Sequence, residues 1–326
     1  MSIGKALIAA AVAIGCLAAP TGVQATDPVA TYPTKPVRII IGPIANFTDI
    51  VTRQLAHRLQ ERWQQPVVVE NRASGMISAA AVANAAPDGH TLLMSDRTWR
   101  AVAQSLYKEL PYNPDRDFSQ IAHVAATPNL LVAHPSLPAS SLEEFVAYAR
   151  THRPPLSYAT AGIGTATHLP GEQLKQLTGI DIAAVHYKGG GAAMNAILNG
   201  EVKIGFNPVA LGQPHLRAGK VKALLITSKK RFSGSPEIPT VIEAGLSDLE
   251  ADYWIGLFAP ARTPPTLIAK INRDVVAILE SSSMRSLLLE QGAEAVPGTP
   301  DEFAAFINRE IQKWGQIIRT AGIKPE

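Results

Sequence analysis

Cysteine is almost absent from this chain of 326 residues, which contains only Cys16. Cys16 lies in an N-terminal segment that we expect to be removed, so the mature chain would have no thiol for a disulfide, a thiolate nucleophile or a thiolate metal site. Aromatic residues make up only 6%, which argues against a stacking surface for single-stranded nucleic acid. A charge excess is lacking too, because a formal net charge of +3 is too small for a nucleic-acid or membrane footprint.

Long apolar runs are confined to the N-terminus. Lys5 precedes an apolar run over residues 6–19, which is too short to span a bilayer, and Val23-Gln24-Ala25 offers small residues at a cleavage site. We therefore predict that residues 1–25 are a secretory signal peptide and that the mature protein is soluble outside the cytoplasm. The alternative is a lipoprotein box that ends at Cys16, although Ala13 is weak at its first position and apolar residues continue beyond the cysteine.

What the chain does have is a globular composition, with 46% hydrophobic and 17% charged residues, and alternating strand and helix patterns. The short β-branched run Val37–Ile41 lies between Pro36 and Gly42, which predicts a buried strand. A helix is expected from Thr48 to Trp63 because apolar residues recur there at helical spacing. With further strands predicted at 66–70 and 91–94, the first half reads as a βαβαβ unit with a parallel sheet.

The pattern begins again after residues 129–133. We expect helices that begin at Ser140, at Thr165 and at Gly190, and strands at 156–159, 182–186, 202–206 and 222–227. Two long amphipathic helices are predicted at 264–279 and from Thr299 to Ile318, the second with a capping box. There is no flexible linker, so we predict two α/β lobes joined by crossing strands at 129–134 and 253–259. Lobe one would comprise about residues 32–131 and 254–326, and lobe two residues 132–253.

The stretch "SYATAGIGTATH", residues 157–168, combines a strand end, two glycines and a helix start. Gly162 and Gly164 permit a tight turn that exposes backbone N–H groups, and Thr165 and Thr167 can cap the helix or donate hydroxyl bonds. Such a helix N-terminus favours an anion by about 0.3–1 kcal/mol before hydrogen bonds are counted. The alternative is a plain strand-to-helix turn. A nucleotide site is not indicated, because no lysine follows the glycines and the G-x-G-x-x-G spacing is absent.

Motifs for catalysis are missing from the sequence. The histidines show no H-x-x-H or H-E-x-x-H spacing for a metal, and there is no G-x-S-x-G elbow. We therefore expect no enzyme activity, no metal and no cofactor, with a hydrolase acting on an anionic substrate as a remote alternative.

Ten segments in consecutive order resemble one known family. They include "YPTKPVRIII", "TDIVTRQLAHRL", "VVVENRASG", "AAPDGHTLLM" and "LYKELPYNPDRDF" in the first half. The later ones are "LSYATAGIGTATHLPGEQLKQLTGIDI", "HYKGGGAAMNAILNGEV", "PHLRAGKVKALLITSKKR", "IPTVIEAGL" and "QGAEAVPGTPDEFAAFI". From about residue 32 to the C-terminus the chain is similar to the Bug receptors, the extracytoplasmic substrate-binding proteins of tripartite tricarboxylate transporters.

The resemblance implies an α/β, two-lobe periplasmic binding-protein fold of type II with a ligand cleft between the lobes. It further implies a monomeric protein that captures a small carboxylate without a cofactor and delivers it to the permease subunits of a membrane transporter. A receptor that docks on a membrane sensor would have the same pocket, so the sequence leaves transport and signalling both open.

The first loop departs from the family pattern. Where the family carries a turn that resembles Pro-Gly-Gly-Gly-Thr-Asp, this chain has Pro43-Ile-Ala-Asn-Phe-Thr-Asp49, so Asn46 and Phe47 would occupy space where backbone meets a ligand. Neutral drift in a loop is the alternative to an altered pocket.

Two further departures follow. Residues 95–100, Ser-Asp-Arg-Thr-Trp-Arg, replace a stretch of small residues, so that Arg97 or Arg100 could clamp a carboxylate and Trp99 could form an apolar wall. The alternative is a solvated charge cluster with a packing tryptophan. Asn207 stands where the family often has aspartate, which disfavours an ammonium-bearing ligand.

Other positions keep the family pattern. Tyr187-Lys-Gly-Gly190 retains its Tyr-Lys-Gly, with Lys188 either near the ligand or exposed, and His168 either faces the cleft or caps and packs. The predicted ligand-binding residues are Asn46, Phe47, Thr48, Asp49, Ser95, Arg97, Thr98, Trp99, Thr160, Gly162, Gly164, Thr165, His168, Tyr187, Lys188, Gly189 and Asn207.

Overall fold

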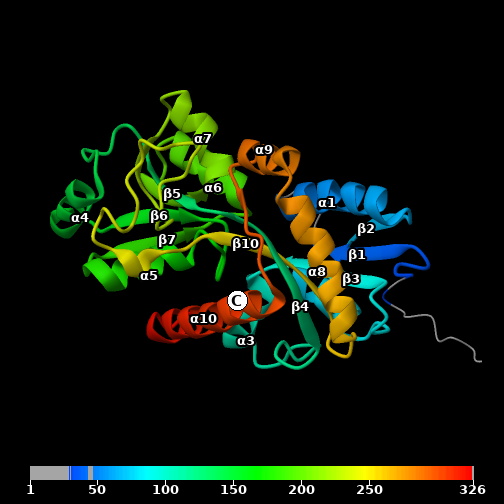
Figure 1. Cartoon of the computed structure of the whole chain (residues 1–326). Helices are drawn as coiled ribbons and strands as arrows, with labels where there is room; N and C mark the ends of the chain where they lie inside the picture. Colours follow the sequence, from blue (N-terminus) through cyan, green and yellow to red (C-terminus); the bar gives the residue numbers. More distant parts are fainter. Residues whose placement is uncertain (1–28, 30, 43–46, 325–326) are drawn as a thin grey trace, which may run out of the picture.

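Two β-sheets, each covered by helices on both faces, make up the molecule (Figure 1). The computed structural model describes Val29 and residues 31–42 and 47–324. The predicted signal peptide and Asn46 lie outside these residues. Within the described part of the chain, no helix is both long and apolar enough to cross a membrane.

The first sheet has six strands in the order β11-β4-β10-β3-β1-β2, and we call it, with its helices, lobe one. Strands β2, β1 and β3 are parallel, whereas β10 is antiparallel to β3 and β4 on either side of it. The strands are β1 (Val37–Ile41), β2 (Val67–Asn71), β3 (Thr91–Asp96), β4 (Phe118–Thr127), β10 (Tyr253–Pro260) and β11 (Glu294–Ala295).

The faces of this sheet follow the alternation of side chains along its strands. Ile39 and Ile41 point into a core shared with α1, α8 and α9, whereas Ile40 points into a second core with α2 and α10. The helices of lobe one are α1 (Phe47–Trp63), α2 (Gly75–Ala83), the π-helical turn η1 (Thr98–Val102), α3 (Ala103–Leu106), α8 (Pro265–Leu279), α9 (Ser282–Glu290) and α10 (Pro300–Thr320).

The second sheet has five strands in the order β7-β6-β8-β5-β9, and with its helices it forms lobe two. Strands β7, β6 and β8 are parallel, and β5 is antiparallel to its neighbours β8 and β9. The elements are β5 (Asn129–Ala133), α4 (Leu142–Thr151), β6 (Leu156–Thr160), α5 (Leu169–Thr178), β7 (Ile182–His186), α6 (Gly190–Leu198), β8 (Ile204–Pro208), α7 (Val209–Arg217), β9 (Lys222–Ile226) and the 3₁₀ turn η2 (Ser247–Leu249).

The chain crosses between the lobes twice, through Pro128 on the way out and just before Tyr253 on the way back. Hydrogen bonds tie the two crossings together. The Asn129 side-chain amide donates to the Ala251 carbonyl at 2.6 Å. Thr227 bridges the crossings as well, because its hydroxyl accepts from the Asn129 N–H at 2.8 Å and donates to the Asp252 carboxylate at 3.2 Å. The crossings therefore form one joined connection between the lobes.

Most predicted elements are present with shifts of a few residues. The predicted boundary after residue 131 would cut β5, which pairs along its length with β8 and β9, so sheet pairing moves that boundary to Pro128. The helix expected from Thr165 begins at Leu169, because residues 161–168 form a compact turn. Strand β4 has no counterpart among the predicted elements.

Candidate functional site

The carboxyl ends of the parallel strands in both sheets mark where a ligand would lie, since open α/β sheets bind ligands beyond these ends. In lobe one these ends are Ile41, Asn71 and Asp96, followed by the starts of α1, α2 and η1. In lobe two they are Thr160, His186 and Pro208, followed by the turns that lead into α5, α6 and α7.

The turn between β6 and α5 leaves backbone donors free. Its conformation depends on glycine, because Gly162 has φ +128° and Gly164 has φ +70°, both in the left-handed region. Within the part of the chain that the structure describes, the N–H groups of Ile163, Ala166 and Thr167 donate to no atom. Three free N–H groups in one turn can donate hydrogen bonds to the oxygens of a single anion.

Side chains hold this turn together. The Thr160 hydroxyl accepts from the Gly162 N–H at 3.1 Å and lies 2.6 Å from His186 Nδ1. The Thr165 hydroxyl donates to the Gly162 carbonyl at 2.7 Å. His168 is 4% exposed, and its Nδ1 accepts from the Gly164 N–H at 3.1 Å. His168 therefore packs inside the turn rather than in an open position in the cleft, and although it is the N-cap residue of α5, its side chain does not cap that helix.

The protonation state of His168 fits that role. Burial lowers the pKa of its imidazole to about 4, with the nearby His186 ring acting in the same direction. The ring is accordingly neutral at physiological pH, which Nδ1 requires if it is to accept a hydrogen bond.

The same turn lies against lobe one. A Cβ atom on Gly164 would be 2.7 Å from Leu106 Cδ1 and 3.2 Å from Val102 Cγ1, both in the segment η1–α3. Leu169, the first residue of α5, shares a buried cluster with Val102 and Trp314. The free N–H groups thus belong to a turn at the seam between the lobes.

The predicted residues at the start of α1 connect to the end of β3 through Tyr253. The Tyr253 hydroxyl donates to the Asp96 carboxylate at 2.7 Å and lies 3.1 Å from the Thr48 hydroxyl. Burial and Asp96 raise the pKa of Tyr253 well above its usual value, so the hydroxyl stays protonated. The ring of Phe47 packs edge-on against Tyr253 at 6.0 Å, and the carboxylate of Asp49 accepts from Arg53 and Asn71.

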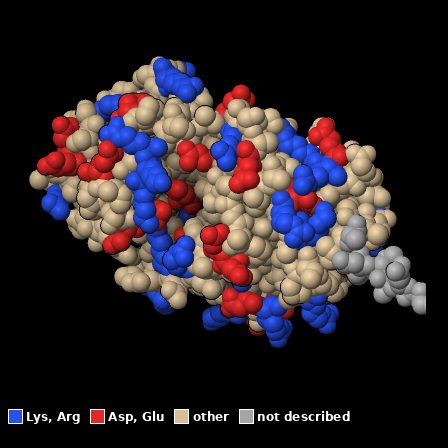
Figure 2. Space-filling view, viewed as in Figure 1, with Lys and Arg blue, Asp and Glu red and all other residues tan. Residues whose placement is uncertain are grey.

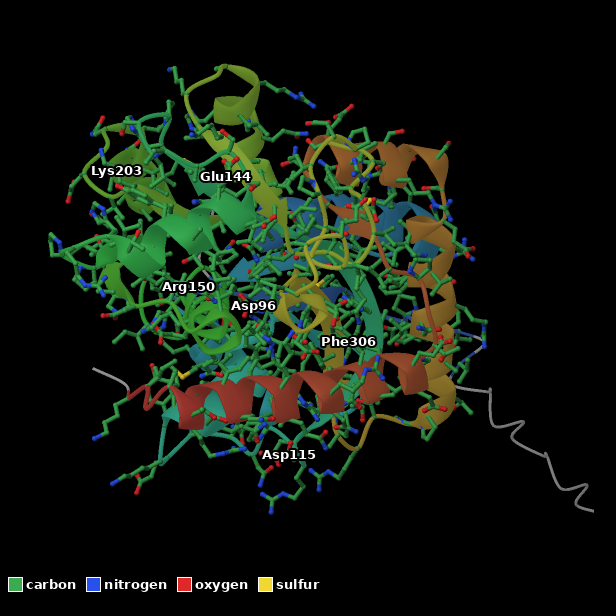
Figure 3. All side chains as sticks on the ribbon, turned by 90° about the vertical axis from the view of Figure 1, so that its left-hand side faces the viewer. Asp96, Asp115, Glu144, Arg150, Lys203 and Phe306 are labelled. Atoms are coloured by element: carbon green, nitrogen blue, oxygen red, sulfur yellow. The ribbon has the colours of Figure 1, made fainter. Side chains whose placement is uncertain are left out.

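The structure separates the two arginines that the sequence offered as carboxylate clamps. The Arg97 guanidinium lies 4.2 Å from the centre of the Trp314 ring on α10, is 1% exposed, and none of its three nitrogens has a hydrogen-bond acceptor in the described chain. Burial lowers the pKa of Arg97, and the acids that oppose this are first Glu310 and then Asp96. For Arg100 the opposing acid is Asp115. Figure 3 shows these two acids far apart, with Asp96 in the middle of the molecule and Asp115 at its outer edge below α10.

Trp99 belongs to the hydrophobic core. Its indole is fully buried, with ring centres 4.6 Å from Phe118 and 5.1 Å from Phe258. This is the packing alternative rather than the apolar wall of a ligand site. Ser95 is buried beside Gly75, and Thr98 is exposed with its N–H bonded to Asp96.

The remaining predicted residues lie at the carboxyl edge of lobe two. The Tyr187 N–H bonds to the Thr160 carbonyl, and the Tyr187 hydroxyl donates to Glu201 at 2.8 Å. Lys188 is exposed, and Gly189, with φ +92°, precedes α6. Asn207 is fully buried, and neither its amide oxygen nor its amide nitrogen has a partner in the described residues.

Sequence reasoning overlooked the start of α2. Ser74 caps this helix by accepting from the Ile77 N–H, while the N–H groups of Gly75 and Met76 donate to no atom of the described chain. Gly42, which follows β1 directly, lies against the Gly75 nitrogen. The serine-glycine pair in "VVVENRASG" was the available sign of this second anion-favouring helix start.

A hollow of about 1130 Å³ opens on the α10 side of the crossings. Figure 2 shows it between the two halves of the molecule, with acidic side chains gathered around it. Asp252 and Glu310 line it together with Lys313, whose ammonium donates to the Glu250 carbonyl. Burial and Glu250 raise the pKa of Asp252 to about 7. Within the described residues no group of three or more His, Cys, Asp or Glu side chains could hold a metal ion.

Comparison with known proteins places this geometry in a defined family. The profile described as "Tripartite tricarboxylate transporter family receptor" matches residues 51–323. Protein BugT of Bordetella pertussis is 35% identical over 315 residues, which cover 95% of this chain and 97% of that protein.

Solved structures agree in fold. That of R. palustris Rpa4515 with adipate has a TM-score of 0.79 at 33% identity, covering 90% of this chain and all of that one. MatC from Rhodopseudomonas palustris with bound malate has a TM-score of 0.74 at 34% identity and covers 88% of this chain and all of that one. The periplasmic binding protein BugD has a TM-score of 0.74 at 31% identity, over 90% of this chain and all of that one. The expected two-lobe α/β fold of a periplasmic binding protein is confirmed.

Proposed function

The chain belongs to the tripartite tricarboxylate transporter receptor family, which includes the Bug receptors, and from this premise we propose that it captures a small carboxylate between its two lobes. The observation that supports this most strongly is the β6–α5 turn, with three free N–H groups at the seam with lobe one. Free backbone donors at a helix start bind a carboxylate through charge-assisted hydrogen bonds. Two similar structures hold aliphatic dicarboxylates, so dicarboxylates are the first candidates for the ligand.

The proposed contacts come from both lobes. Lobe two supplies the N–H groups of Ile163, Ala166 and Thr167. It also supplies the side-chain amide of Asn207, whose two polar atoms lack partners in the described chain. Lobe one supplies the starts of α1 and α2, with Thr48 and the N–H groups of Gly75 and Met76. Trp99 is not among these contacts, because the core already covers its ring.

The proposed activity is binding followed by closure of the lobes, with no bond broken and no metal or cofactor. A cleft between two lobes joined by a single connection closes by bending at that connection. We propose that the monomeric protein acts outside the cytoplasm and delivers its ligand to the membrane permease subunits of a tripartite transporter. Uptake of the ligand by cells with the permease subunits but no receptor, with and without the added protein, would test the delivery step.

Ligand capture is tested by thermal shift on the mature protein with mono-, di- and tricarboxylates, aromatic acids and acidic amino acids. A ligand at 100 times its Kd adds about 2.7 kcal/mol to the free energy of unfolding, which is readily measured as a rise in Tm. The matched control is the diamide of each active diacid, because it keeps the shape and removes the charge. A shift with the acid and none with the diamide supports the proposal. The absence of a shift with every acid would refute it.

A further inference from the structure

Three N–H groups of the β6–α5 turn are already used by side chains of the turn and its flanks, before any ligand arrives. The N–H groups that these side chains occupy are not available to a ligand. The accepting side chains therefore determine which donors stay free, without contacting the ligand themselves. The bonds are those from Ala161 N–H to Thr167 Oγ1 at 2.8 Å, from Gly162 N–H to Thr160 Oγ1 at 3.1 Å and from Gly164 N–H to His168 Nδ1 at 3.1 Å.

Gly164 has the least freedom of the three donors. It is buried, its φ of +70° is left-handed, and a Cβ atom at this position would meet Leu106 of lobe one at 2.7 Å. Because this N–H is buried, a protein acceptor has to take the place of water. Of the described atoms, only His168 Nδ1 accepts this hydrogen bond.

His168 is itself fixed by its surroundings. Its ring lies 4.8 Å from that of His186 on β7 and is stacked 6.4 Å from that of Tyr158 on β6. His168 Nε2 is 3.8 Å from the carboxylate of Glu172, which in turn accepts from Tyr158 at 2.7 Å and pairs with Lys175. With Nδ1 acting as an acceptor, the ring proton resides on Nε2 and faces the carboxylate.

We propose that His168 is a positioning residue of the receptor site: its neutral imidazole accepts the Gly164 N–H and so holds the turn in the one conformation that leaves three N–H groups for the ligand. The inference rests on the proposed function and adds which residue sets the geometry of the anion site. An apolar or positively charged side chain at position 168 leaves the buried Gly164 N–H without an acceptor, and the turn must then rearrange.

The experiment compares His168→Asn with His168→Leu. The asparagine amide oxygen occupies nearly the place of Nδ1 and keeps an acceptor, whereas leucine has similar bulk and no acceptor. With the carboxylate that gives the largest thermal shift, we expect His168→Leu to raise Kd by about tenfold and His168→Asn to stay within about threefold of the wild type, because an unpaired buried donor costs on the order of a factor of ten. Circular dichroism verifies that both variants fold.

Equal affinities of His168→Leu and the wild type would overturn the inference, as would a His168→Asn variant as weak as His168→Leu. His186→Asn is the matched control, because it alters the neighbouring ring without touching the Gly164 bond, and it should bind more tightly than His168→Leu. The pH profile gives another check. Burial lowers the pKa of His168 to about 4, so the Kd of the wild type should not change with pH near 6.5. A change in Kd near pH 6.5 that is present in the wild type and absent from His168→Asn would contradict a neutral imidazole.

A measurement without ligand separates this inference from the proposed function. Hydrogen exchange of the Gly164 amide should be slow in the wild type and in His168→Asn, and faster by at least tenfold in His168→Leu. If exchange follows this order but no carboxylate binds the wild type, the proposed function fails and the ligand part of the inference fails with it, while the assigned hydrogen bond stands. If the Gly164 amide exchanges equally slowly in all three proteins, the positioning role is refuted even where a carboxylate binds.

Discussion

Replacement of Gly164 by alanine tests the contact between the β6–α5 turn and lobe one. The left-handed backbone at this position disfavours any side chain by about 1–2 kcal/mol. In addition, the new methyl group would lie 2.7 Å from Leu106 Cδ1 and 3.2 Å from Val102 Cγ1, where overpacking costs about 1–3 kcal/mol. We therefore expect Gly164→Ala to lower the free energy of unfolding by about 2–5 kcal/mol.

Gly179→Ala provides the matched control for this prediction. Gly179 has nearly the same φ, +68° against +70°, but beyond its chain neighbours no described atom lies within 4 Å of the position that its new methyl group would take. It should therefore show only the backbone cost of about 1–2 kcal/mol. The difference between the two variants measures the overpacking at the seam between the lobes.

Urea denaturation of both variants, alone and in a Leu106→Ala background, is the assay. Shortening Leu106 removes the closest contact, so most of the excess cost of Gly164→Ala should disappear in the double mutant, giving a coupling energy of about 1–2 kcal/mol. Equal costs for Gly164→Ala and Gly179→Ala, or additive effects with Leu106→Ala, would show that the turn does not press on lobe one.

Three further substitutions probe the charges between α10 and the crossings. Arg97→Met should change the free energy of unfolding by less than about 1 kcal/mol or increase it, since a buried guanidinium without an acceptor is replaced by an apolar chain of similar length; a loss above 2 kcal/mol in urea denaturation contradicts this. Asp252 has a raised pKa of about 7, so the folded protein binds more protons than the unfolded chain between about pH 4 and 7, and stability falls as pH rises through that window. Asp252→Asn should flatten this part of the stability–pH curve and make the variant the more stable protein at pH 8, by about 1–3 kcal/mol; an unchanged slope refutes the assignment. Glu310→Ala should cost about 2–4 kcal/mol, because the carboxylate accepts from the indoles of Trp254 and Trp314, each at 2.8 Å. The control Arg309→Ala, at an exposed neighbouring position, should cost less than about 1 kcal/mol in the same urea denaturation assay.

Most helices and strands could be predicted because they are determined by residues within or directly beside the element. Val37–Ile41 is a β-branched run between proline and glycine, and Thr299 with Glu302 forms the capping box that opens α10. Strand β4, with its histidine, glutamine and alanines, has no clear alternation. It is a strand because β10, more than 120 residues later, pairs with it along its length. That pairing depends on tertiary structure and leaves little trace in residues 118–127.

In the candidate site, too, the sequence predicted the features that depend on local residues and left open those that depend on distant ones. The glycine turn after β6 was predicted from Gly162 and Gly164, whose conformational preferences are local, although the helix that follows begins at Leu169 and not at the expected Thr165. The roles of Trp99 and Arg97 were not decided by the sequence, since distant segments supply Phe118, Phe258 and Trp314, the rings that surround them. The π-helical turn η1 contributes too, because its wider winding shifts which side of the chain each residue faces.

The position of β10 has a consequence for how the protein acquires its structure. Lobe two uses one continuous stretch of chain for its five strands, so its sheet can form as soon as residues 129–226 are available. Lobe one needs β10 between β3 and β4, and until that strand arrives the hydrogen-bonding edges of both earlier strands are open. During synthesis from the N-terminus, the half that begins first is therefore completed last. A chain that ends before residue 253 would contain a finished lobe two and two unpaired strand edges able to associate with other chains.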